Sequence, residues 1–161
     1  MRRFLLPVLV LTLSLLLSAC GGGQGSKWGN LQLTLEKVEQ TDKQWSARMV
    51  LTNPTDKVQV IQYNAPARYT MIITQGDKEI LNRPFDMRTK EEPEILNLSK
   101  GVAKDYVVAW TYLDADGNRV PPGTYEISVR LEAITVVQEA GQAQPTVVEP
   151  RQVGPVKVTV K

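Results

Sequence analysis

The chain has 161 residues, with 19 Lys and Arg against 17 Asp and Glu, no His, one Cys and 6% aromatic residues. Without His it cannot carry Ser-His-Asp or Cys-His catalysis, a His-ligated zinc ion or an imidazole pH switch, and a single Cys excludes an intramolecular disulfide or a thiolate cluster. The length suits one domain, and the nearly balanced charge gives no basic excess of the kind that binds nucleic acid.

The N-terminal segment has the layout of a secretory signal. Arg2 and Arg3 give it a positive start, residues 4–17 are almost wholly apolar, and Leu17-Ser18-Ala19 lead to Cys20. The apolar run is too short to span a membrane comfortably, and it lacks the polar face of a core helix. We therefore predict a signal peptide over residues 1–19.

The small residues before Cys20 resemble the lipobox of bacterial lipoproteins. The resemblance implies that the Cys20 thiol carries a diacylglycerol and that the chain is cut just before it. Acyl chains that contribute about 0.8 kcal/mol per buried CH₂ make such an anchor lasting. The alternative is an ordinary signal peptide that leaves a free thiol. We expect the protein in the bacterial cell envelope, held by lipid on the outer face of the cytoplasmic membrane or on the outer membrane.

The expected mature chain runs from Cys20 to Lys161 and is formally neutral, because loss of Arg2 and Arg3 leaves 17 basic side chains against 17 acidic ones. In residues 20–29, Cys20 is followed by Gly21-Gly22-Gly23, which predicts a flexible tether. Residues 30–161 then form a single domain. A neutral domain of this kind would recognise a partner by shape rather than by long-range charge.

The domain alternates apolar and polar residues in short runs, which predicts strands with one buried face. Two hairpins are expected, one turning at residues 53–56 and one at residues 75–78. Residues 82–94 and 138–145 predict loops, and residues 104–112 a central strand. The predicted strands lie at 31–38, 45–51, 58–61, 69–73, 79–81, 95–98, 104–112, 124–131, 147–148 and 153–160. With no helix after the signal, this pattern favours an all-β, immunoglobulin-like antiparallel sandwich.

Several groupings suggest chemistry, but their spacing or setting argues against it. Asp114-Ala115-Asp116-Gly117 lacks carboxylates at the first and last positions of a calcium loop and predicts a hairpin turn. Glu91-Glu92 and Glu94 have no apolar setting to raise a pKa, and Ser99-Lys100 point to opposite sides of an extended chain. We expect no catalytic residue, no metal and no cofactor.

Large aromatic residues are expected to serve the core. Trp45 and Trp110 fall within apolar strand patterns, where a sandwich needs bulky side chains to fill its interior. Tyr125 follows Pro121-Pro122-Gly123-Thr124 in the manner of a tyrosine corner, in which the hydroxyl bonds a nearby backbone carbonyl.

The order of these features between residues 45 and 131 resembles the intracellular proteinase inhibitor family, also called BsuPI. The positions that carry the resemblance are Asn53, Thr55, Tyr69, Gly76, Glu79, Ile80, Leu98, Gly101, Trp110 and the stretch Gly117-Asn118-x-Val120-x-Pro122-Gly123-Thr124-Tyr125. The chain differs from the family at Thr70, Lys100 and Val102. The resemblance implies an immunoglobulin-like sandwich with inhibitory activity, to which residues 134–161 add strands or an edge ribbon.

Together these observations predict a membrane-anchored, non-enzymatic sandwich that binds another protein, with proteinase inhibition as one form of that binding. Residues 63–68 and 83–93 are the candidate binding loops, because Pro stiffens both and their basic side chains could enter an acidic specificity pocket. The candidate residues are Asn64, Pro66, Arg68, Arg83, Arg88 and Lys90. The alternative is an envelope scaffold that pairs through sheet edges, which the Val-rich tail at 153–160 suggests. A small enzyme that uses carboxylates or Lys alone is a third hypothesis.

Overall fold

The structure is a computed structural model that describes residues 24–28, 30–87, 94–132, 134–138 and 146–161. The predicted signal peptide, Cys20, Arg88, Lys90 and most of the loop expected at 138–145 lie outside these residues. Every regular element in the described part of the chain is a strand, and no helix there is long and apolar enough to cross a membrane.

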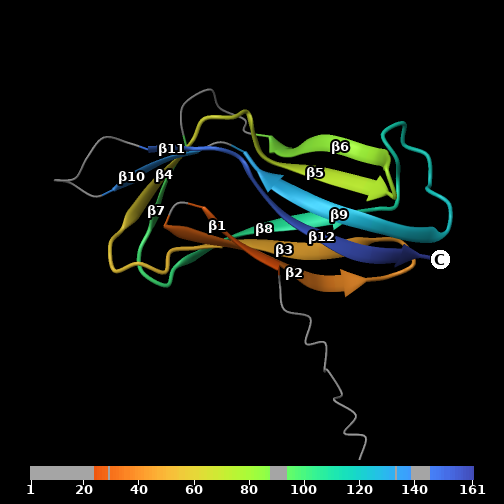
Figure 1. Cartoon of the computed structure of the whole chain (residues 1–161), viewed down its shortest axis with the longest axis horizontal. Helices are drawn as coiled ribbons and strands as arrows, with labels where there is room; N and C mark the ends of the chain where they lie inside the picture. The colour runs from red at the N-terminus through yellow and green to blue at the C-terminus, as the bar shows by residue number, and fades with distance from the viewer. Residues whose placement is uncertain (1–23, 29, 88–93, 133, 139–145) are drawn as a thin grey trace, which may run out of the picture.

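Two four-stranded antiparallel sheets face each other and form the sandwich (Figure 1). The first has the order β1-β2-β3-β8, with β1 at Gln24–Trp28, β2 at Leu31–Gln40, β3 at Trp45–Thr52 and β8 at Ala103–Trp110. The second has the order β12-β9-β5-β6, with β12 at Arg151–Val160, β9 at Gly123–Leu131, β5 at Ala67–Gln75 and β6 at Lys78–Met87. Strands β2, β3 and β8 take the places of immunoglobulin strands A, B and E, and β5, β9 and β12 those of C, F and G. The predicted fold class is confirmed.

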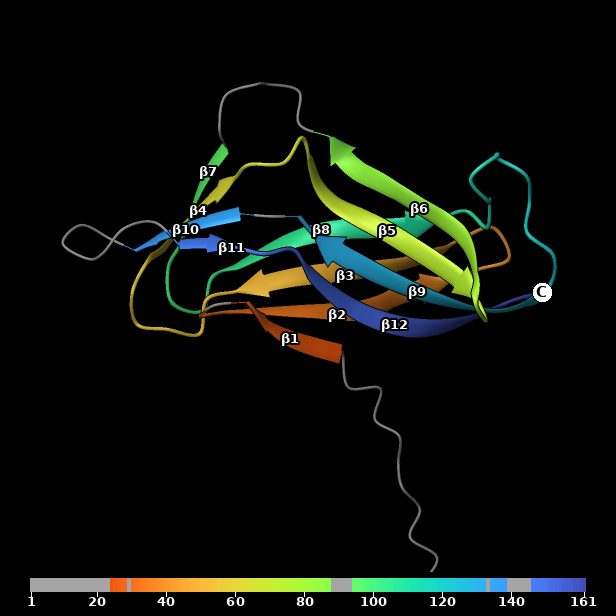
Figure 2. The same ribbon diagram turned by 45° about the horizontal axis from the view of Figure 1, so that its top comes forward.

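A third, smaller sheet lies at one end of the sandwich (Figure 2). Its order is β11-β10-β4-β7, with β11 at Thr146–Val148, β10 at Ile134–Gln138, β4 at Gln59–Tyr63 and β7 at Glu94–Leu98. Strands β10, β11 and β12 all come from the C-terminal part of the chain, so that residues 134–161 add to both the small sheet and the second large one.

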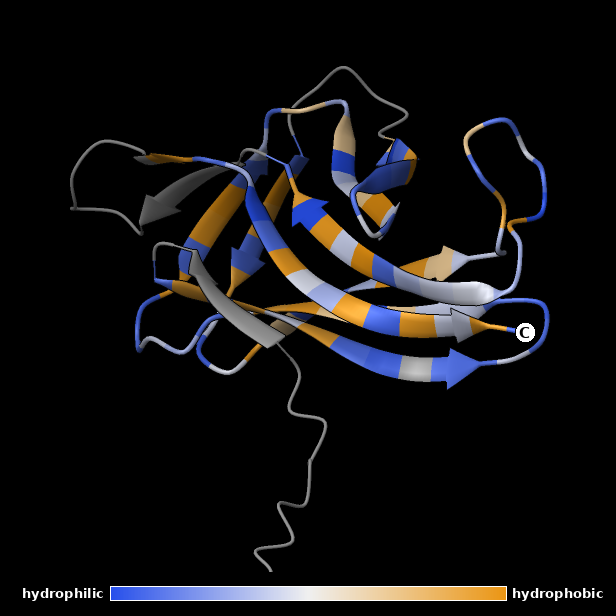
Figure 3. Ribbon diagram, turned by 45° about the vertical axis from the view of Figure 1, so that its right-hand side comes forward, coloured by the Kyte–Doolittle hydropathy of each residue, from blue (hydrophilic) through white to orange (hydrophobic). Residues whose placement is uncertain are grey.

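The core fills the space between the two large sheets. Strand β9 shows how alternation along a strand builds this core. Its apolar residues at alternate positions are all fully buried, and they are Tyr125, Ile127, Val129 and Leu131. The residues between Tyr125 and Ile127 and on either side of Leu131 are polar, and Ser128 between Ile127 and Val129 is polar as well. The same alternation gives the long strands bands of contrasting hydropathy in Figure 3. Trp45 and Trp110 are both in this core, as predicted.

Two turns have the predicted chemistry. The Tyr125 hydroxyl donates a hydrogen bond to the Pro121 carbonyl at 2.7 Å, which is the bond of a tyrosine corner. The hairpin between β5 and β6 turns at Gly76, whose φ of 56° suits glycine.

The hairpin predicted at residues 53–56 is wrong. Strand β3 pairs with β2 and β8, whereas β4 pairs with β7 and β10, so the chain crosses from a large sheet to the small one here. The fully buried side-chain amide of Asn53 stabilises this crossing. Its nitrogen donates to the Lys57 carbonyl at 2.7 Å and to the Leu98 carbonyl at 2.8 Å. Its oxygen accepts bonds from the amide and hydroxyl of Thr55. These bonds close a local turn and tie it to a strand distant in sequence.

Three further expectations need correction. Strand β8, predicted to be central, pairs with β3 alone among the described strands and has exposed residues on its outer face. Residues 82–87 of the expected loop belong to β6, which pairs with β5. Residues 24–28 of the expected tether form β1, which pairs with β2 along its whole length. In β6 and β1, pairing with the neighbouring strand of a hairpin overrides a locally polar or glycine-rich sequence.

We predict that Asn53→Ala lowers the free energy of unfolding by about 3 kcal/mol, because it leaves buried carbonyl and amide groups without partners. Urea unfolding of the two proteins measures the difference. The control is Asn97→Ala on the exposed face of β7, which should change the value by less than about 0.5 kcal/mol. A loss of less than about 1 kcal/mol for Asn53→Ala would show that the crossing does not depend on this amide.

Candidate functional site

The predicted binding residues separate into three groups. Asn64 and Pro66 are exposed in the connection between β4 and β5. Arg68 lies on β5 and Arg83 on β6, so these two residues belong to strands and not to the loops predicted for them. Arg88 and Lys90 lie outside the described residues. The structure therefore does not bring the four described residues together as one loop surface.

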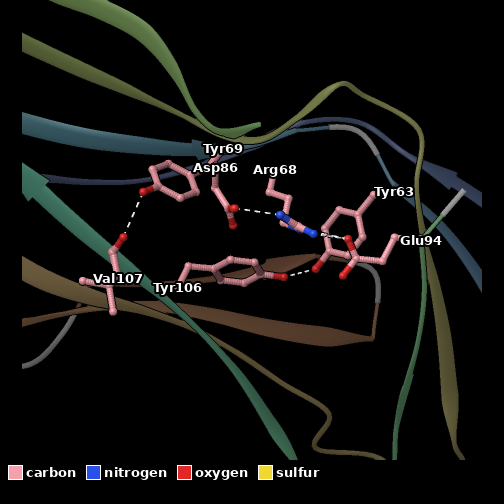
Figure 4. A network of polar contacts seen from close by, with 7 residues as sticks. All are labelled: Tyr63, Arg68, Tyr69, Asp86, Glu94, Tyr106 and Val107. Atoms are coloured by element: carbon pink, nitrogen blue, oxygen red, sulfur yellow. Dashed lines mark hydrogen bonds and ion pairs between the residues drawn. The ribbon is translucent and has the colours of Figure 1, made fainter. Parts of the chain in front are cut away.

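Arg68 forms ion pairs with Asp86 and Glu94 that connect three strands, and we call this group the clasp (Figure 4). Its guanidinium bonds to Asp86 of β6 at 2.7 Å, and its Nε donates to Glu94 of β7 at 3.0 Å. Burial opposes the charged form, but the bonds to Glu94 and Asp86 outweigh it and raise the pKa of Arg68. Because the Arg68 side chain is only 20% exposed and already paired with two carboxylates, it is not available to enter the specificity pocket of a proteinase.

Three buried tyrosines extend this clasp across the molecule. The hydroxyl groups of Tyr63 on β4 and Tyr106 on β8 bond to each other, and burial is the main cause of the raised pKa of Tyr63. The Tyr69 hydroxyl, from β5, donates to the Val107 carbonyl at 2.9 Å and so bridges the two large sheets. Sequence reasoning missed this network because its members lie far apart in the chain.

The network has no arrangement suited to catalysis. Its charged groups are Arg68 and the two carboxylates that it binds. Its hydroxyl groups form hydrogen bonds with each other and with a backbone carbonyl. Within the described ranges, no group of three or more His, Cys, Asp or Glu residues could hold a metal ion. The Asp114 carboxylate, once a calcium candidate, accepts the amides of Asp116 and Asn118 and shapes its own turn.

The sandwich is open on the side where β6 and β8 form the sheet edges. On the opposite side β12 contacts β1 and β2 and covers the gap between the sheets. On the open side two hydrogen bonds cross the gap, one from Tyr69 to Val107 and one from the Ala115 amide to the Ile80 carbonyl at 3.1 Å. The space between these two bonds is a depression of about 210 Å³, which we call the notch.

The notch is lined mainly by apolar side chains of the core and its margin. Trp110 and Phe85 provide aromatic surface, and Leu113 at the rim is 38% exposed. Arg83 and Asp114 are the charged residues at its wall. The complete lining is Met71, Leu81, Arg83, Phe85, Ala109, Trp110, Thr111, Leu113, Asp114 and Gly117. A site of this size and composition can take one aromatic or large aliphatic side chain.

The strands beside the notch are poorly suited to pairing with a whole additional strand. Strand β6 carries Pro84, which has no N–H, together with exposed Lys78 and Glu79. On β8 the Val107 carbonyl is already taken by Tyr69. The Val-rich tail that suggested edge pairing is also part of the core, since Val153, Val158 and Val160 are buried.

A second, more polar cleft of about 550 Å³ lies near the C-terminal end of β12. Its lining is Lys37, Gln40, Thr41, Asp42, Tyr112, Thr159 and Lys161. Tyr112 adopts a φ of 61°, and its hydroxyl donates to the Thr41 carbonyl at 2.7 Å. This bond closes the end of the sandwich, and the cleft is lined mainly by polar and charged residues.

Comparison with known proteins gives little. No protein family matches the chain, and no curated protein matches it. One solved structure, a β-glucosidase from Erythrobacter marinus, aligns with 85% of this chain and 16% of its own length, at 16% identity and a TM-score of 0.32. A likeness this small carries no argument about activity.

We predict that the free energy of unfolding falls as the pH rises from about 10 to 12. Burial, and then the charge of Asp86, raise the pKa of Tyr69 from its ordinary 10.0 to about 12, so above pH 10 the unfolded chain releases a proton that the folded protein retains. Tyr69→Phe should flatten the decline and, at lower pH, leave a constant loss from its missing bond to Val107. Denaturant unfolding across the pH range tests this. An unchanged slope in Tyr69→Phe would show that Tyr69 is not the group that titrates.

Proposed function

We propose that the chain is a lipid-anchored, non-enzymatic β-sandwich of the bacterial envelope that binds another protein at the notch. The N-terminal sequence supports the anchor, through the small residues before Cys20. The notch supports the binding, because it exposes aromatic and aliphatic surface on the open side of the sandwich. The tyrosine and Arg68 network supports a binding role over an enzymatic one, since its polar groups are spent on holding strands together.

The observation that carries this proposal is the preformed shape of the notch. Hydrogen bonds hold both ends of it, and the side chains of Trp110 and Leu81 form part of the buried core. A preformed pocket loses little conformational entropy when it binds, and the strongest contributions at protein interfaces come from aromatic anchors in such pockets.

Proteinase inhibition enters this proposal as one form of binding. The resemblance to the inhibitor family motivates it, together with the basic residues Arg88 and Lys90. Arg68 is excluded from that role by its ion pairs, and Arg83 lies on a strand at the notch. The same purified protein should therefore be assayed against a panel of proteinases.

We predict that Cys20→Ser releases the protein from membranes. The thiol at this position is the only one in the chain, so no other residue can form the thioether. Fractionation of cells that express each form, with metabolic labelling by a fatty acid, measures the outcome. Ser18→Thr, which leaves the thiol in place, serves as the control. Labelled, membrane-bound Cys20→Ser protein would contradict the lipid anchor.

We predict that Leu113→Ser weakens partner binding at least about tenfold, because it removes apolar surface from the rim of the notch, where Leu113 is 38% exposed. The soluble Cys20→Ser protein is immobilised, retained envelope proteins are identified, and the affinity of each purified candidate is measured. Val107→Ser is the matched control, since Val107 is an apolar residue that is 75% exposed and does not line the notch.

A true partner is retained by the parent protein and by Val107→Ser, but not by Leu113→Ser. Equal unfolding midpoints of the three proteins ensure that the loss is local. A partner that binds Leu113→Ser as tightly as the parent uses another surface, and that result overturns the assignment of binding to the notch.

A further inference from the structure

Arg83 occupies an unusual position for a charged residue. The register of β6 on β5 places it opposite Met71, between Leu81 and Phe85, on the face of the sheet that looks toward the core. Because β6 is an edge strand, this face is open to solvent at the notch, and Arg83 is exposed there. Its guanidinium carbon lies 5.0 Å from the centre of the Phe85 ring.

No described carboxylate forms an ion pair with Arg83. By contrast, Arg48, Arg68 and Arg130 each have at least one carboxylate within ion-pair distance. The other charged group of the notch, Asp114, directs one carboxylate oxygen at the backbone amides of Asp116 and Asn118, at 3.0 and 2.8 Å. Among the residues that the structure describes, the notch therefore presents apolar surface beside a positive group that has no carboxylate partner.

A guanidinium in this setting is suited to bind a carboxylate. The aromatic ring beneath it fixes its plane and shields one face from water, while its N–H groups remain directed outward. Paired bonds from a guanidinium to a carboxylate are short and geometrically specific. An inward-pointing charge on an edge strand can also serve only to discourage strand pairing, and the experiment below separates that role from recognition.

We propose that the notch recognises an acidic peptide segment, in which an aromatic or large aliphatic side chain enters the notch and a neighbouring carboxylate pairs with Arg83. This inference rests on the proposed function and names the chemistry of the partner's segment. The apolar lining selects the anchor, and the unpaired guanidinium selects the sign of the neighbouring charge.

The proposal is tested with a synthetic peptide, acetyl-Gly-Ser-Glu-Phe-Glu-Ser-Gly-amide, added to the isotope-labelled soluble Cys20→Ser protein. Nuclear magnetic resonance follows the backbone amides and the indole N–H of Trp110, which lines the notch. The expected shifts are confined to β6, β8 and the turn after β8. A peptide with Ser in place of Phe should bind at least about tenfold more weakly, since it lacks the anchor.

Charge reversal gives the decisive comparison. Arg83→Glu should weaken the Glu-Phe-Glu peptide at least about tenfold and strengthen a Lys-Phe-Lys peptide relative to the parent protein. Arg151→Glu is the matched control, because Arg151 is exposed on β12, at the opposite edge of the same sheet. It should leave both affinities within about twofold of the parent, since it lies more than a screening length of about 8 Å from the notch.

The outcomes distinguish this inference from the function on which it rests. Absence of binding at millimolar peptide, shifts elsewhere on the sandwich, or equal binding of both peptides by the parent and Arg83→Glu overturns the inference. An Arg83→Glu protein that only self-associates more readily, with unchanged peptide binding, assigns Arg83 to edge protection and also overturns it. If a natural partner is still lost in Leu113→Ser, the notch remains a protein-binding site whose ligand has other chemistry.

Discussion

The amide of Asn53 fixes the place where the chain leaves the first large sheet, and the arrangement of the open side depends on that placement. It joins the end of β3, the turn that follows and the end of β7, while the Gly101 amide donates to the Asn53 carbonyl at 2.9 Å. Every one of these groups is a backbone or amide group at a junction between sheets, where the regular ladder of hydrogen bonds stops. A buried side chain that supplies the missing partners is the physical condition for such a junction.

The small sheet positioned by this junction supplies two members of the polar network. Tyr63 from β4 reaches Tyr106 on the first large sheet, and Glu94 from β7 reaches Arg68 on the second. The two large sheets are thus connected through the small one as well as directly by Tyr69 and Val107. Such part-buried ion pairs contribute less to the free energy of folding than their geometry suggests, because desolvation offsets the attraction. Their effect is better described as holding β5, β6 and β7 together, while the bond from Tyr69 to Val107 links β5 to β8 beside the notch.

The sequence allows the strands to be predicted because burial on one face imposes a period of two, which is a local property. Tyr125 could be assigned for the same reason, since its hydroxyl bonds a carbonyl only four residues before it. Asn53 could not, because the local turn chemistry of a hairpin and of a crossing between sheets is the same, and the carbonyl that distinguishes them lies 45 residues away. Arg68 was predicted as a free basic residue for a similar reason, since its carboxylate partners follow it by 18 and 26 residues.

A notch that accepts a single side chain can support only modest affinity, since most of the binding free energy at an interface comes from a few buried anchors. The proposed lipid anchor at Cys20 lowers the affinity that binding requires. A protein held at a membrane and a partner held at the same membrane meet at a raised effective concentration, so that a weak and specific contact suffices. The formal neutrality of the proposed mature chain agrees with this arrangement, because encounter within a membrane plane does not need long-range electrostatic steering. Discrimination between partners then falls to short-range features, which in this molecule are the apolar lining of the notch and the one guanidinium beside it.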